Sequence, residues 1–80
     1  MPTVLHWNGY RFYFFSHEGE EPPHIHIDKA GHSAKFWLNP VKLASSSGFK
    51  DNALRDLEKK VRTERQQFLK AWHGYFKNQR

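Results

Sequence analysis

The chain has 80 residues, a formal net charge of +5 and no cysteine. A chain of this length forms one small domain, which excludes a two-domain enzyme and a doubly wound nucleotide-binding fold. The lack of cysteine excludes a disulfide framework and a cysteine-based zinc site. No apolar stretch is as long as a membrane span requires, and the first residues do not resemble a signal peptide. We therefore expect a cytoplasmic protein that does not enter a membrane.

The first predicted element is a β-hairpin around the Asn8–Gly9 turn. Asn-Gly favours a two-residue turn with positive φ at both positions, and β-type residues flank it on both sides. We therefore predict strands at residues 3–7 and 10–15, which share one strongly apolar face. The pairs that this turn implies are Trp7 with Tyr10, Leu5 with Phe12 and Thr3 with Phe14.

A second hairpin follows an acidic loop that ends in two prolines. Residues 24–28 and 33–38 alternate between polar and apolar side chains, which is typical of half-buried strands. A loop with an even number of residues, either 30–31 or 29–32, places their apolar side chains on one face. The opposite face then carries His24, His26, Asp28, Ser33, Lys35 and Trp37, with His24 across from Trp37 and His26 across from Lys35.

The rest of the chain is predicted to be mainly helical. Residues 41–44 form a short apolar segment that fits an edge strand, and the Ser-Ser-Ser-Gly stretch at 45–48 is predicted to be a flexible break. Between residues 51 and 77, apolar side chains recur at steps of three, four and seven, as on one face of a helix. Such a helix is long for a small domain, so one helix or two helices broken near Arg62 and Thr63 both fit. Asp51 fits an N-cap or a first-turn acid.

Together these elements predict an α+β fold in a single domain, 1–80. A small antiparallel sheet of two hairpins, with or without a fifth edge strand, packs against the helical part. Residues 1–48 form the sheet region and residues 49–80 the helical region. The charge divides at the same point, because the sheet region is neutral and the whole +5 lies in the helical region.

The sharpest candidate site is the Pro-Pro-His-Ile-His segment. His24 and His26 lie two residues apart on a strand, so their side chains point the same way. Two imidazoles so placed are candidates for an acid and a base that act on one phosphate ester. Lys35 and Arg11 would then stabilise the negative charge that develops in the reaction.

Three other interpretations of the same segment stay open. The first is a binding face to which Pro22, Pro23 and Trp37 contribute without catalysis. The second is a weak metal site formed by the two histidines and Asp28, although we expect no cofactor. The third is a strand whose polar residues simply face solvent.

The helical region carries a second candidate surface. Its central basic run consists of Lys59, Lys60, Arg62 and Arg65. These side chains could straddle the phosphates of a nucleic acid, dock an acidic partner protein, or form an ordinary solvated helix face.

Six short segments of the sequence occur together in a known family: residues 1–5, 9–14, 21–27, 34–38, 48–49 and 69–76. Through them the chain resembles the small prokaryotic family called domain of unknown function 4160. Members of that family are often encoded beside a second small protein, in an arrangement similar to a toxin–antitoxin pair. The resemblance therefore implies an operon-encoded partner, and its shared motif falls on Pro22, Pro23, His24 and His26. Relatives tend to begin the helix with Ser-Pro, where this chain has Lys50 and Asp51.

Our leading hypothesis is a binding module of a toxin–antitoxin-like pair, which binds a partner protein, a nucleic acid or both. The rival is a small histidine-dependent ribonuclease or phosphoesterase-like toxin. A second alternative is a metal-binding protein that uses the His-x-His strand. The sequence alone does not decide whether the protein is an enzyme.

Overall fold

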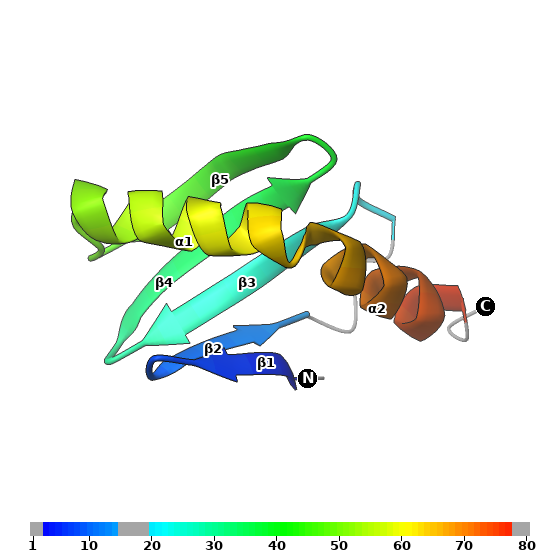
Figure 1. Ribbon diagram of the computed structural model, residues 1–80, viewed down its shortest axis with the longest axis horizontal. Helices are drawn as coiled ribbons and strands as arrows, with labels where there is room; N and C mark the ends of the chain where they lie inside the picture. Colours follow the sequence, from blue (N-terminus) through cyan, green and yellow to red (C-terminus); the bar gives the residue numbers. More distant parts are fainter. Residues whose placement is uncertain (1–2, 15–19, 78–80) are drawn as a thin grey trace.

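The computed structural model describes residues 3–14 and 20–77. Five antiparallel strands lie in the sheet in the order of the chain, and two helices follow them (Figure 1). The strands are β1 (Thr3–Trp7), β2 (Tyr10–Tyr13), β3 (His24–Lys29), β4 (His32–Leu38) and β5 (Val41–Ser47), and the helices are α1 (Asp51–Thr63) and α2 (Arg65–Lys77). The predicted α+β class is confirmed.

The first hairpin turns at Asn8–Gly9, where both residues have the positive φ expected, 50° and 80°. Two of the three predicted pairs are present, but Thr3 lies opposite Tyr13 rather than Phe14. The register shifts because β1 contains one extra residue relative to β2, a bulge that alternation in the sequence does not reveal. Position 15, the predicted end of the second strand, lies outside the described residues.

The second hairpin turns at Ala30 and Gly31, so the shorter of the two even loops is correct. His24 lies opposite Trp37 and His26 lies opposite Lys35, as the parity argument predicted. The fifth strand is present but longer than expected, because the serines at 45–47, predicted to be a flexible break, pair with residues 33–35 of β4. That pairing satisfies their backbone groups and outweighs the weak strand preference of serine.

The helical region contains two helices, separated at Glu64. Lys50 occupies the N-cap position of α1 without a side-chain hydrogen bond, and Asp51 lies in the first turn. The break is small, because the N–H of Glu64 still bonds to the carbonyl of Lys60 and the carbonyl of Glu64 accepts from the N–H of Phe68, each at 2.9 Å. It is nevertheless enough for α1 to lie across the sheet while α2 extends beyond the end of the sheet (Figure 1).

The core lies between one face of the sheet and the two helices. Its buried side chains are Phe12, Phe14, Ile25, Ile27, Ala34, Phe36, Leu38, Val41, Leu57, Val61, Phe68 and Trp72. Leu5 and Leu54 are half-buried and pack at its edge. α1 and the beginning of α2 pack on this face, so no described helix lies over the other face (Figure 1). Neither helix is long and apolar enough to cross a membrane in the described part of the chain.

Candidate functional site

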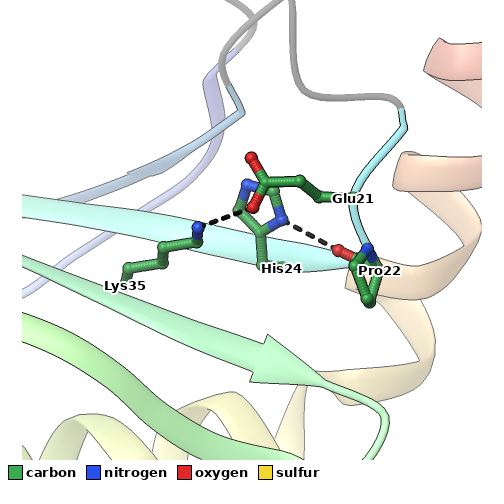
Figure 2. Close-up of polar contacts among 4 residues, drawn as sticks. All are labelled: Glu21, Pro22, His24 and Lys35. Carbon is green, nitrogen blue, oxygen red and sulfur yellow. Dashed lines mark hydrogen bonds and ion pairs between the residues drawn. The ribbon is translucent and has the colours of Figure 1, made fainter.

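His24 begins β3, and none of its surface is exposed. Its Nδ1 lies 2.9 Å from the carbonyl oxygen of Pro22 (Figure 2). Because a carbonyl oxygen can only accept, Nδ1 carries the proton and donates this hydrogen bond. The expectation of a solvent-facing strand is therefore wrong at His24, the residue on which both the catalytic and the metal hypotheses depended.

Aromatic rings enclose His24. The centroid of its imidazole lies 4.8 Å from that of Trp72, 5.1 Å from that of His26 and 5.6 Å from that of Trp37. Trp72 comes from α2, whereas the other two rings belong to β3 and β4. The alternation of side chains along the predicted strand correctly placed His24 on the same face as Trp37. Alternation cannot show that a residue from a distant helix covers the start of the strand.

The two prolines before His24 are held through their carbonyl groups. Pro22 accepts from His24, and the carbonyl of Pro23 accepts a 3.0 Å hydrogen bond from the N–H of Leu38 at the end of β4. Proline has no N–H, so a carbonyl is its one backbone hydrogen-bonding group. The Pro-Pro-His motif thus braces the chain as it enters the sheet, which gives the motif a structural role that its spacing alone did not indicate.

The face of the sheet opposite the helices carries polar and aromatic side chains. We call it the open face and define it by Arg11, Tyr13, His26, Asp28, Lys35 and Trp37. Tyr13 is buried in this face, with 5% of its surface exposed, and its hydroxyl donates a 3.0 Å hydrogen bond to Oδ2 of Asp28. The His26 ring stacks on Tyr13 with centroids 5.5 Å apart, and the Arg11 guanidinium carbon lies 4.4 Å from the centre of the Tyr13 ring.

Lys35 connects this face to the proline segment. Its Nζ lies 2.9 Å from Oε1 of Glu21, the residue before Pro22, whose side chain reaches over the sheet (Figure 2). The same Nζ lies 4.6 Å from the centre of the Trp37 ring, a cation–π contact. The positive charge of Lys35 is therefore already compensated within the described residues.

The residues proposed for catalysis are close together but differ in exposure. His26 is half-buried, whereas His24 lies beneath it, and the two rings meet edge to face. Arg11 lies on the neighbouring strand, opposite Asp28, and its Nε is buried without a hydrogen-bond partner among the described residues. A search of the described residues finds no cluster of three His, Cys, Asp or Glu side chains that could hold a metal ion.

The four basic residues predicted on the helix do not form one surface. Arg65 turns toward the β4–β5 connection, where its Nε donates to the carbonyl of Leu38 at 2.7 Å and an Nη donates to Oδ1 of Asn39 at 2.9 Å. Arg62 lies 3.5 Å from Oε2 of Glu58, one turn earlier on α1. Arg65 is therefore used to hold the fold together, and Arg62 is partly compensated.

Lys59 and Lys60 lie elsewhere, beside the first hairpin. They line a groove between α1 and the β1–β2 turn, and Nζ of Lys60 lies 5.1 Å from the centre of the Trp7 ring. Sequence reasoning singled out these two lysines but missed Trp7, because β1 and α1 are far apart in the sequence. Only the position of Trp7 next to the hairpin turn could have indicated that its ring lies at the end of the sheet.

A sequence model of the family described as Domain of unknown function (DUF4160) matches residues 9–73. This match runs from the β1–β2 turn into α2, so the chain belongs to that family. No match was found among curated proteins or among solved structures.

Proposed function

We propose that this member of the DUF4160 family is a binding module that docks a partner protein on its open face, as one half of a toxin–antitoxin-like pair. The observation that carries the proposal is the set of ordered side chains on a sheet face that no described helix covers (Figure 1). Trp37 and Arg11 are half-buried, so part of each side chain faces solvent, and both are of the residue types that dominate the binding energy of protein interfaces. The buried Tyr13 ring lies against Arg11 and supports it.

The order of these side chains supports a binding role. Tyr13 is held by Asp28 and lies between His26 and Arg11, so its ring has little rotational freedom left to lose. Trp37 is held in the same way by Lys35. Side chains that are already fixed in the free protein lower the entropic cost of association.

The charges of the open face favour a protein partner over a nucleic acid. Lys35 is paired with Glu21, and the guanidinium of Arg11 lies against the Tyr13 ring. Binding to a phosphate backbone depends on cations that release counterions, and paired cations contribute little to it. An interface between proteins, in contrast, readily accommodates paired charges around aromatic anchors.

The position of His24 favours binding over histidine-dependent catalysis. A general acid or base must come within hydrogen-bonding distance of the substrate or of one bridging water. His24 is fully buried and donates its Nδ1 proton to Pro22, so a substrate on the open face would meet His26 and not His24. The role that fits His24 is to position His26 and the ring of Trp37.

Co-expression with the small protein encoded beside the gene tests this proposal. We expect a complex that survives size-exclusion chromatography, and calorimetry should show that Trp37→Ala and Arg11→Ala each weaken it by about 30-fold or more, the effect of an interface hot spot. Arg55→Ala is the matched control, because this arginine is exposed on α1, on the opposite side of the molecule. Absence of a complex, or wild-type affinity in both open-face variants, would contradict the proposal.

A further inference from the structure

A row of aromatic rings crosses the end of the sheet where the β1–β2 and β3–β4 turns lie side by side (Figure 1). Trp7 and Tyr10 stack with centroids 5.8 Å apart and ring planes 21° apart. Tyr10 in turn lies 5.8 Å from Phe49, whose ring lies 5.5 Å from that of His32. Trp7, Tyr10 and Phe49 are all half-buried, so part of each ring faces solvent.

Lysines stand beside these rings. Nζ of Lys29 lies 4.5 Å from the centre of the Tyr10 ring and donates a 2.9 Å hydrogen bond to the carbonyl of Asn8. Nζ of Lys60 lies 5.1 Å from the centre of the Trp7 ring, and Lys59 is exposed next to it. Within the described part of the chain, none of these three lysines is in an ion pair. Unlike Lys35 on the open face, these ammonium groups are therefore not held in a direct ion pair within the described residues, although the carboxylate of Asp56 lines the same groove as Lys59 and Lys60.

The rings and lysines border a groove of about 410 Å³ between α1 and the β1–β2 turn. Its lining residues are Trp7, Asn8, Asp56, Lys59, Lys60 and Thr63. This volume lies in the lower part of the range of small-ligand sites, so the groove is suited to one ring-sized group rather than to a long chain of a partner protein. One wall offers an indole, and the other offers two ammonium groups.

We infer that this surface, defined by Trp7, Tyr10, Lys29, Lys59 and Lys60 and named here the hairpin-end surface, binds single-stranded nucleic acid. Aromatic rings interleaved with unpaired cations are the arrangement on which unstacked bases and phosphates bind chiefly through stacking and charge, with modest preference among the bases. Base faces in a duplex are already stacked, so a ring-sized groove of this kind selects single strands. This site is separate from the open face and goes beyond the proposed docking of a partner protein.

Asp56 in the groove sets the orientation of the bound nucleotide. A carboxylate repels a phosphate but accepts hydrogen bonds from the exocyclic amino group of a base. The base therefore enters the groove toward Asp56 and Trp7, and the phosphates remain outside, beside Lys29 and Lys59. A base without an amino group, such as uracil, should bind less well than cytosine.

Fluorescence anisotropy of labelled oligonucleotides of about 12 nucleotides, a length within the range that such surfaces cover, tests the inference. The RNA and DNA single strands are measured separately, and binding of either strand supports the inference. We expect Trp7→Ala to weaken binding by about tenfold or more and the Lys59→Ala, Lys60→Ala double variant to reduce the steepness of the salt dependence. Because Trp7→Ala can also lower stability, Trp7→Phe is measured beside it. This variant keeps an aromatic ring and should therefore retain most of the affinity.

Lys70→Ala is the matched control, because Lys70 is exposed on α2 and its replacement removes one positive charge, as does each replacement in the double variant. Three results would overturn the inference: wild-type binding by the double lysine variant, an equal loss in Lys70→Ala, or equal affinity for a duplex of the same length. Partner binding through the open face is measured without nucleic acid, so the two proposals can fail independently.

Discussion

Replacing His24 perturbs the most deeply buried polar group that the structure describes. His24→Ala removes an imidazole that contacts Trp72, Trp37 and His26, and it deprives the carbonyl of Pro22 of its hydrogen bond. Truncation of a buried ring costs about 3–5 kcal/mol, and loss of the hydrogen bond to Pro22, which is an exposed residue, adds about 0.5–1.5 kcal/mol. Since domains of this kind are stable by only about 5–15 kcal/mol, we expect His24→Ala to be largely unfolded or close to it.

Two further replacements separate the hydrogen bond from the packing. In His24→Asn, the amide nitrogen is attached to Cγ as Nδ1 is, so it can still donate to Pro22, but the outer half of the ring is lost. In His24→Phe, the ring volume remains and the donor is absent. The second variant should lose about 0.5–1.5 kcal/mol, the net contribution of one hydrogen bond, and both should be more stable than His24→Ala.

Urea unfolding followed by circular dichroism gives these differences as free energies of unfolding. Tryptophan fluorescence gives a second probe, because Trp37 and Trp72 both contact the His24 ring. A cost below about 1 kcal/mol for His24→Ala would refute the reasoning, because so small a loss is typical of exposed positions. So would a His24→Phe variant that is as unstable as His24→Ala, since the packing would then contribute nothing.

Three other replacements test separate parts of the fold. In urea unfolding, Arg65→Ala should lower the free energy of unfolding by about 1.5–3 kcal/mol, because the guanidinium donates two hydrogen bonds to the β4–β5 connection. Arg62→Ala removes only an exposed ion pair and should lower it by less than about 1 kcal/mol. Equal losses in the two variants would contradict this difference in their roles. Gly74→Ala should raise the melting temperature by about 2–8 °C, because a Cβ there meets nothing and alanine favours the helix, and a lower melting temperature would show that the position is constrained. Gly48→Ala should instead destabilise the protein by about 1–3 kcal/mol, since its φ is 94° and a Cβ would collide with the side chain of His32; a neutral result would count against that turn geometry.

The sequence was most informative where a turn and an alternation constrained each other. Asn8–Gly9 set the first hairpin, and the requirement that Ile25 and Ile27 share a face with Phe36 allowed only even loops in the second. These local rules alone predict the pairing of His24 with Trp37. The bulge in β1 and the strand formed by the serines at 45–47 were missed, because both depend on how a neighbouring strand pairs.

Burial and grouping of the candidate site residues could not be predicted in the same way. His24 is buried because Trp72, from the far end of the chain, lies against it, and no periodicity links these two positions. Likewise, Lys59 and Arg65 belong to one basic run in the sequence, but they lie on different parts of the surface. Lys59 lines the groove beside the first hairpin, whereas Arg65 bonds to the β4–β5 connection after the helix break. The sequence predicts which residue types are present, while contacts between distant segments decide which of them meet.

The central claim is that the molecule has two separate binding surfaces, the open face for a partner protein and the hairpin-end surface for single-stranded nucleic acid. Titration of the nitrogen-15-labelled protein with each ligand, followed by two-dimensional nuclear magnetic resonance, tests it most directly. We expect the partner to shift the amide signals of Tyr13, His26 and Trp37, and the oligonucleotide to shift those of Trp7 and Lys59. One common set of shifted signals for both ligands, or shifts of each set by the other ligand, would show that the two surfaces are not separate sites with these ligands.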